Sequence, residues 1–225
     1  MPTDAILAVP SGADREASLE LAFQSHFFYE LVTLLAVLDP TAAIPVFLGV
    51  TAGLSTRQSL QVAAYAVGTA FLVLLFFIAA GQFLLTALGI PMPSFQLAGS
   101  IVLTLFGLKL VLGQISAEVE ATPATATMAQ RAVYPLAIPT IAGAGAMLTV
   151  VLLTDNDTRS LGEQALTTVR MVVALLIVLG VLVLSRPIYR LIGKPGIEVV
   201  SRVSGLILAS IGVNGIILAI RMSFQ

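Results

Sequence analysis

Six long apolar segments recur along this chain of 225 residues and leave only short polar stretches between them. A helix needs about 20 apolar residues to cross the hydrocarbon core of a bilayer, and each segment reaches about that length. Their apolar residues are continuous rather than alternating, which favours helices over the strands of a membrane barrel. We therefore predict an all-α membrane protein with six transmembrane helices, at residues 25–51, 60–88, 95–113, 134–154, 166–190 and 199–221.

The composition excludes several other classes of protein. Only 10% of the residues are charged, against roughly 25% in an ordinary soluble domain. The chain has no cysteine, which excludes disulfides and cysteine-based metal or redox sites. Its net charge of -1 offers no basic surface for nucleic acid. The single histidine, His26, lies at the start of the first predicted helix, where both an interfacial and a functional role are open to it.

Sequence signatures of enzymes are absent. The chain contains no Walker loop, no H-E-x-x-H, no G-x-S-x-G and no Cys/His pair. A single aspartate, Asp39, falls within a predicted helix, which argues against a membrane protease that uses two aspartates. We therefore expect no enzyme, no metal site and no cofactor. Any transport would be secondary or would depend on a separate ATPase subunit.

The lysines and arginines in the loops and towards the ends of the predicted helices indicate an orientation. Residues 1–24 lack a cationic start and a long apolar run, so we expect a polar tail, not a signal peptide, before the transmembrane domain at 25–225. If the N-terminus lies outside, seven basic residues fall on the cytoplasmic side and four on the periplasmic side. Cytoplasmic loops are usually richer in basic residues, so this count favours both termini in the periplasm. The seven are Arg57, Lys109, Arg131, Arg186, Arg190, Lys194 and Arg202, and the four are Arg15, Arg159, Arg170 and Arg221.

Two pairs of similar segments indicate an internal repeat. "AAIPVFLGV" at 42–50 resembles "LAIPTIAGA" at 136–144, and "LGIPMPSFQLAGSIVL" at 88–103 resembles "IGKPGIEVVSRVSGLIL" at 192–208. Three crossings leave a chain on the far side of the membrane, so two successive three-helix halves have opposite orientations. We therefore predict two inverted three-helix repeats whose Pro-interrupted first helices enclose a central site. Chance similarity between apolar segments of biased composition is the alternative.

Asp39, Pro40 and Pro45 stand in the middle of the first predicted helix. A proline inside a helix removes a backbone hydrogen bond. We therefore expect carbonyl groups from Pro40 and Thr41 to Pro45 to face a polar pocket that binds a cation or an amine. An aspartate near the bilayer centre costs about 2.5–3.5 kcal/mol, and such carboxylates commonly serve ions, protons or substrates. The alternative is that Asp39 only caps a restarted half-helix, and both roles can coexist.

The fourth predicted helix carries corresponding features. Pro135 and Pro139 are expected to free further carbonyl groups, and Gly143 and Gly145 allow backbone to approach backbone or ligand closely. If the helix restarts at these glycines, its first N–H groups would suit a carboxylate. We therefore place the candidate site between residues 39–45 and residues 137–145.

Two further polar residues are candidates for this site. Lys109 lies at a membrane depth similar to that of Asp39, so the two could pair, or Lys109 could extend to the cytoplasmic interface. Asn214, between two glycines of the last predicted helix, could contact a solute or bond to a neighbouring helix. The same helix has a four-residue repeat of small side chains that predicts close packing rather than a site: Ser201, Gly205 and Ala209.

Five blocks of the sequence resemble the MarC family of six-helix bacterial inner-membrane proteins. The blocks cover nearly all of the chain after the tail and are "LDPTAAIPVFLGVT", "STRQS", "FGLKLVLG", "YPLAIPTIAGAGAMLTV" and "RVSGLILASIGVNGII". The function of the family is largely unestablished, and some members are described as transporters of small neutral amino acids. The resemblance therefore implies a multi-pass inner-membrane protein with a small neutral amino acid as its solute.

The chain departs from the family pattern in two blocks. The first block usually reads Asp-Pro-x-Gly-Asn-x-Pro, whereas here Ala42 and Ala43 replace the Gly and the Asn. The fourth-helix block usually has Gly-Pro-Gly, whereas this chain has Gly143, Ala144 and Gly145. The candidate site is thus less polar and its second break has one proline fewer. These differences indicate a divergent branch with a different solute or a weaker activity.

Together these features predict a secondary transporter or exporter of a small solute, such as a neutral amino acid, in the bacterial inner membrane. Its expected partners are the lipid bilayer, the solute, and a coupling cation or proton at Asp39. No nucleic-acid partner is expected, and a homo-oligomer is compatible with the sequence. The alternative is a non-transporting membrane scaffold or accessory subunit in which Asp39 only caps a helix.

Overall fold

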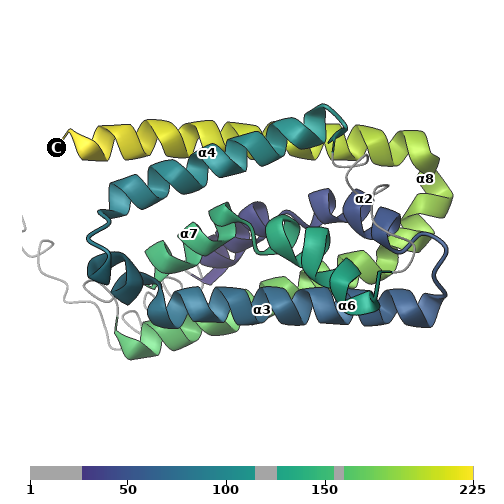
Figure 1. Cartoon of the computed structure of the whole chain (residues 1–225), viewed down its shortest axis with the longest axis horizontal. Coiled ribbons are helices and arrows are strands. Elements are labelled where there is room, and N and C mark those ends of the chain that lie inside the picture. Colours follow the sequence, from purple (N-terminus) through teal and green to yellow (C-terminus); the bar gives the residue numbers. More distant parts are fainter. Residues whose placement is uncertain (1–26, 115–125, 155–159, 225) are drawn as a thin grey trace, which may run out of the picture.

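The computed structural model describes residues 27–114, 126–154 and 160–224, and within these residues it contains helices and turns but no strand (Figure 1). The predicted tail and His26 lie outside the described residues. A first helix covers residues 27–38. The elements that follow are α2 (Pro40–Val50), α3 (Thr56–Ala87), α4 (Met92–Val111), α6 (Met128–Arg131), η1 (Ala132–Ile141), α7 (Ala144–Leu153) and α8 (Leu161–Ser223).

Among the described residues, five helices are long and apolar enough to cross a membrane. They are Phe27–Val50, Thr56–Ala87, Met92–Val111, Gly162–Leu191 and Pro195–Ser223. The fourth predicted crossing is a bent pair, Met128–Ile141 and Ala144–Leu153, whose two parts meet at 58°. Counted as one span, this pair brings the number to six. These helices confirm the prediction of an all-α membrane protein.

Local sequence signals set the helix ends. α3 and α8 each begin with a capping box, formed by Ser55 with Gln58 and by Ser160 with Glu163. α8 is divided at Gly193, whose φ of 66° lies in the left-handed region that glycine adopts without strain. The chain turns back at this glycine, so α8 supplies both the fifth and the sixth crossing (Figure 1).

The helices run back and forth between two ends of the molecule (Figure 1). The Thr51 end contains the turn at 51–55, the end of α4, α6 and the turn at Gly193. The Ser223 end contains the turn at 88–91, the start of α8 and its last residues. α4 and the second half of α8 form one edge of the bundle, and α3 and the first half of α8 form the other. α2, η1 and α7 lie between these two edges.

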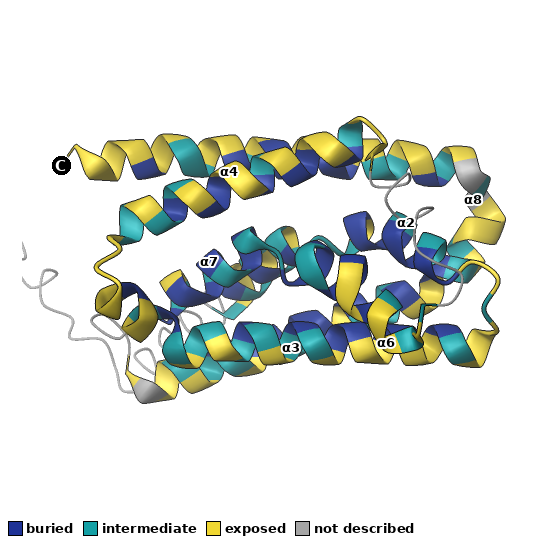
Figure 2. Cartoon of the chain, viewed as in Figure 1, coloured by how far each residue is buried: buried dark blue, intermediate teal, exposed yellow. Residues whose placement is uncertain are grey.

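The buried core surrounds the middle elements (Figure 2). Val46 and Phe47 of α2 are almost fully buried, together with Leu136 of η1 and Val150 of α7. The outward faces of the long helices carry large exposed apolar side chains, including Phe83 at 73% exposure. So much exposed apolar surface is unusual for a soluble monomer, whereas in a bilayer it contacts lipid.

α4 and the second half of α8 pack through glycines. A Cβ atom added at Gly107 would lie 2.5 Å from the backbone nitrogen of Ala209 and 2.7 Å from the backbone oxygen of Gly205. One added at Gly205 would lie 2.7 Å from the backbone oxygen of Gly107. The two backbones are therefore in direct contact, as the predicted small-residue repeat implies for Gly205 and Ala209.

Gly107→Ala is expected to force α4 away from α8, because the atoms that its Cβ would meet belong to the backbone and cannot rotate away. We expect a loss of about 1–3 kcal/mol in unfolding free energy, the range for overpacked sites. Denaturant or thermal unfolding of the purified protein in detergent measures this loss.

Gly180→Ala is the matched control for this substitution. Its added Cβ would have no neighbouring heavy atom within 4 Å. It should therefore stabilise the helix by about 0.5–1 kcal/mol or leave it unchanged. Equal destabilisation by both substitutions would contradict the backbone contact between α4 and α8.

Candidate functional site

The first transmembrane helix is interrupted at a single residue, Asp39. Its φ of 38° and ψ of 75° lie in the left-handed region, which aspartate tolerates better than most residues with a side chain. Its Oδ1 atom accepts a hydrogen bond of 3.1 Å from the backbone N–H of Ala42, and Pro40 occupies the first position of α2. Asp39 therefore caps a half-helix that starts inside a transmembrane span.

A chain of hydroxyl groups connects Asp39 with the last transmembrane helix. The Thr41 hydroxyl donates to Oδ1 of Asp39 at 2.6 Å, and its Oγ1 lies 2.6 Å from Oγ of Ser204 in α8. A hydroxyl has one proton, so Thr41 donates to Asp39 and accepts from Ser204. Ser204 is buried. The carboxylate thus ends a polar chain that crosses from the first helix to the last.

α2 continues through Pro45, which differs from the predicted break at that residue. A residue before proline is disfavoured in the helical region, so Asp39 and Ile44 are both under pressure to leave the helix. Asp39 has a left-handed alternative that a β-branched residue such as Ile44 lacks. The break is therefore confined to Asp39, and residues 27–50 still form one crossing.

The fourth crossing is broken more strongly. Tyr134 and Ile138 have extended backbones, with φ and ψ of -129° and 131° and of -126° and 123°, and each precedes a proline. The Thr140 hydroxyl donates a hydrogen bond of 2.7 Å to the carbonyl of Pro135. This bond satisfies one polar group of the break, as a low-dielectric interior requires. After Ile141 the chain bends by 58° into α7.

α7 begins at this break without a capping side chain. Its N-cap is Gly143, and the first N–H groups of a helix have no partners within the helix. A Cβ atom at Gly143 would lie 2.5 Å from the carbonyl oxygen of Pro139. A Cβ at Gly145 would lie 3.0 Å from the side chain of Leu103 and 3.1 Å from that of Val37. Both glycines therefore allow the break to pack closely against its neighbours.

A small cavity lies between the break of the fourth crossing and α4, and Val37 of the first helix and Leu208 of α8 complete its lining. Its volume is about 20 Å³, which is room for about one water molecule. Most of its lining is apolar, and the exceptions are Thr140 and the backbone that starts α7. The side chains and backbone around it include Val37, Leu103, Phe106, Pro139, Gly143 and Leu208.

Of the predicted site residues, Pro139 and Gly143 line this cavity, and the others do not: Asp39, Pro40, Thr41, Pro45, Gly145, Lys109 and Asn214. Lys109 is exposed in the last turn of α4, as the interfacial alternative predicts. Among the described residues, the polar partners of the Asp39 carboxylate are Thr41 and Ala42, so the predicted pair with Lys109 is not formed. Asn214 is exposed on α8, which differs from the predicted contact with a central site.

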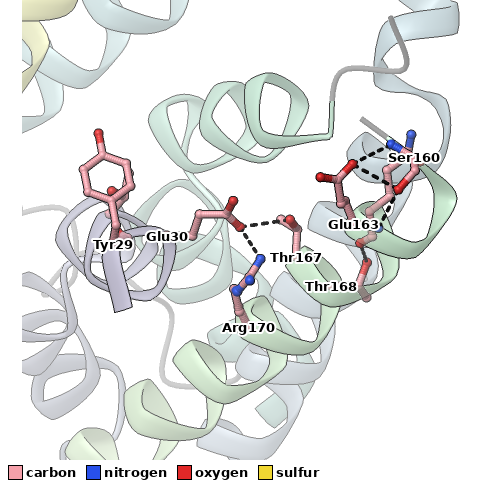
Figure 3. A network of polar contacts seen from close by, with 9 residues as sticks. Tyr29, Glu30, Ser160, Glu163, Thr167, Thr168 and Arg170 are labelled. Atoms are coloured by element: carbon pink, nitrogen blue, oxygen red, sulfur yellow. Dashed lines mark hydrogen bonds and ion pairs between the residues drawn. The ribbon is translucent and has the colours of Figure 1, made fainter. Parts of the chain in front are cut away.

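Sequence reasoning missed a buried ion pair between the first helix and α8 (Figure 3). Nη1 of Arg170 lies 2.6 Å from Oε2 of Glu30, and their side chains are 4% and 1% exposed. The Thr167 hydroxyl donates to the same Glu30 oxygen at 3.0 Å. The sequence does contain a signal, because Glu30 interrupts an apolar run and has an insertion cost like that of Asp39.

Two arginines bind the opposite end of the first crossing. Arg131 donates a hydrogen bond of 2.9 Å to the carbonyl of Val50, and Arg186 donates one of 2.8 Å to that of Leu54. Arg186 also lies 3.4 Å from the carbonyl oxygen of Thr51. Cations at a helix C-terminus stabilise its partial negative charge. α2 thus has a carboxylate at its N-terminus and guanidinium groups at its C-terminus.

Proteins similar to this chain come from archaea and bacteria. The UPF0056 membrane protein of Pyrococcus abyssi is 31% identical over 198 residues, which cover 86% of this chain and 93% of that protein. The corresponding protein of Pyrococcus horikoshii is 33% identical over 190 residues, or 84% and 91% of the two chains. The UPF0056 inner membrane protein YhgN of Escherichia coli K12 is 28% identical over 195 residues, or 85% and 94%. No solved structure matches the chain.

A family comparison covers nearly the whole chain. The model of the MarC family of integral membrane proteins matches residues 24–224, a range that includes both helix breaks, the cavity and the buried ion pair. The relatives are named membrane proteins, in agreement with the five apolar helices and the bent pair found here. The chain is therefore a multi-pass integral membrane protein and belongs to the MarC family.

Proposed function

We propose that this protein is a secondary transporter or exporter of a small solute, such as a neutral amino acid, in the bacterial inner membrane. The observation that carries the proposal is a cavity lined by the break of the fourth crossing, at Pro139 and Gly143, and by Val37, two residues before the interruption of the first crossing at Asp39. Interrupted helices near the bilayer midplane hold substrates and coupling ions in many transporters. The name of the Escherichia coli relative, an inner membrane protein, supports the location.

The two breaks offer complementary charges. The uncapped N-terminus of α7, at Gly143 to Gly145, presents N–H groups and a partial positive charge that suit a carboxylate. Asp39 presents a carboxylate that suits an amine, a coupling cation or a proton. Carbonyl groups around Pro40, Pro45 and Pro139 complete the proposed solute contacts. A zwitterionic amino acid carries both matching groups, which is the chemical reason to favour it.

Transport requires a second conformation of this protein. The cavity of about 20 Å³ holds about one water molecule, which is too little for an amino acid. The cavity must therefore widen before it can hold the proposed solute. The small lining residues Gly143 and Ala146 and the one-residue break at Asp39 are where backbone can shift when the site opens.

The positions of the breaks support the proposal of two inverted repeats. Each break falls in the first crossing of a three-helix set, although Asp39 interrupts its helix for one residue and the other break bends the chain by 58°. Arg131, Arg186 and Lys109 all belong to the Thr51 end. The positive-inside rule then makes the Thr51 end cytoplasmic and the Ser223 end periplasmic.

Asp39→Asn tests the charge of the carboxylate while it preserves the break, because asparagine also caps helices and adopts the left-handed region. In proteoliposomes supplied with a panel of labelled neutral amino acids, we expect the wild type to take up at least one. Asp39→Asn should reduce that uptake about tenfold or more, which corresponds to about 1.4 kcal/mol. Unfolding in detergent should remain close to that of the wild type.

Glu198→Gln is the matched control for Asp39→Asn, because Glu198 is an exposed carboxylate at the start of the last crossing. Its uptake should equal that of the wild type. Wild-type vesicles that take up no solute would contradict transport and favour the scaffold alternative. Normal uptake by Asp39→Asn at every pH would contradict the role of Asp39 alone.

Gly145→Val is expected to block uptake in a protein that still folds. The added side chain would press on Leu103 and Val37, whose ends line the cavity and can shift into it. Overpacking costs about 1–3 kcal/mol. If the solute-bound state has to bear this cost, solute binds more weakly and uptake falls about tenfold. Gly68→Val in α3 is the control, since no neighbouring atom lies within 4 Å of its added Cβ. Full uptake by Gly145→Val would exclude this cavity from the solute path.

A further inference from the structure

The Glu30–Arg170 pair joins the first half of the broken helix to α8 (Figure 3). Oε2 of Glu30 accepts two hydrogen bonds, one from Nη1 of Arg170 at 2.6 Å and one from the hydroxyl of the fully buried Thr167 at 3.0 Å. The Arg170 guanidinium also lies 5.2 Å from the centre of the Phe27 ring. All of these contacts run between residues 27–38 and the first half of α8.

The segment held by this pair ends at the interruption of the helix. Glu30 lies about 14 Å before Asp39, at 1.5 Å per residue. Asp39 has a φ of 38° and lacks regular helical geometry, so residues 27–38 and α2 are two helical pieces joined at one residue. Movement about Asp39 would therefore separate Glu30 from Arg170 and leave α2 in place.

α2 is bound independently at the other end of the same crossing. Arg131 and Arg186 donate to the carbonyl groups of Val50 and Leu54, and neither contact involves residues 27–38. Arg186 belongs to the same half of α8 as Arg170, about 24 Å further along at 1.5 Å per residue. α8 therefore holds the two pieces of the broken helix by separate contacts.

The closed pair leaves one polar group without a partner. Among the described residues, the Nε atom of Arg170 is a buried side-chain donor that makes no hydrogen bond. Water that entered between the two helices would hydrate Nε together with both separated charges. If two apolar side chains stood in the same place, opening would expose their apolar surface to water, which is unfavourable. The ionic pair thus favours a reversible opening, whereas apolar packing would favour permanent closure.

We propose that Glu30 and Arg170 form a gate at the Ser223 end of the protein. When the ion pair separates, residues 27–38 move away from α8 about Asp39, and water from the Ser223 end reaches Val37 at the cavity. This proposal rests on the proposed transport function, because the gate would control access to the candidate solute site. Its test follows the opening itself and requires no solute.

A cysteine introduced at Val37 reports the opening, because the chain has no cysteine of its own and Val37 lines the cavity. The reaction rate of this cysteine with a membrane-impermeant maleimide is measured from each face, in oriented vesicles without solute. An open state populated at about 1% that rises to about 10% would give a tenfold faster reaction. We expect this increase for Glu30→Gln, from the Ser223 face only.

Three further variants separate a gate from a merely structural pair. The charge swap Glu30→Arg with Arg170→Glu restores the attraction and should return the rate to within about twofold of the parent. The double substitution Glu30→Leu with Arg170→Leu should react more slowly than the parent, because apolar packing favours closure. Arg186→Gln, which removes a contact of α2 at the Thr51 end, should not raise the rate from the Ser223 face.

Three results would overturn the gate: an unchanged rate in folded Glu30→Gln, an equal increase from both faces, or a double leucine variant that reacts faster than the parent. If Glu30→Gln fails to fold, the labelling rates of the charge swap and of the double leucine variant test the gate instead. The gate then requires a rate near that of the parent for the charge swap and a slower rate for the double leucine variant. Absence of uptake for every solute would contradict the proposed transport function. It would leave the labelling result intact, so the two failures are distinguishable.

Discussion

A backbone polar group inside a bilayer needs a partner within the protein, and the broken helices of this chain depend on how that need is met. Asp39 supplies the partner at the start of α2, where its carboxylate accepts from Ala42. In the fourth crossing Thr140 supplies it for the carbonyl of Pro135. The N-terminus of α7 has no such side chain. The start of α7, which lines the cavity, is thus the helix start at these two breaks that has no capping side chain.

The charged groups follow the direction of the helices. α2 has the Asp39 carboxylate at its positive end and the guanidinium groups of Arg131 and Arg186 near its negative end. This arrangement is the one that the dipole of a helix favours, and it accounts for three charges close to a predominantly apolar interior. Glu30 and Arg170 need another explanation, since each compensates the other instead of a helix end. A buried ion pair adds little net stability, because the cost of burying two charges offsets much of their attraction. For this reason we favour the proposed role of the pair in motion over a purely stabilising one.

The sequence was sufficient for the all-α membrane class and for an interruption in the first and in the fourth crossing. Long apolar runs report a transmembrane helix directly, and Asp39 and Pro139 mark residues where a helix cannot continue normally. The sequence was not sufficient for contacts between distant segments, such as Thr41 with Ser204 or Glu30 with Arg170. Those contacts depend on the rotation and depth of each helix, which apolar composition does not specify. Pro45 shows a further limit, because α2 continues through this proline and the interruption lies six residues earlier, at Asp39.

The two departures from the usual family pattern have different consequences once the structure is considered. Ala43 is fully buried in the core and does not line the cavity, so the missing asparagine affects the packing of α2 and not the lining of the cavity. Ala144 is the first residue of α7, a position where proline is favoured but not required. The 58° bend between Ile141 and Ala144 forms without a proline at that position, and Tyr134 and Ile138 leave helical geometry in the segment before it. The fourth crossing is thus interrupted first at Tyr134 and Ile138 and then at the bend, where Gly143 allows the backbone to approach the carbonyl of Pro139 and Gly145 allows α7 to approach Leu103 and Val37.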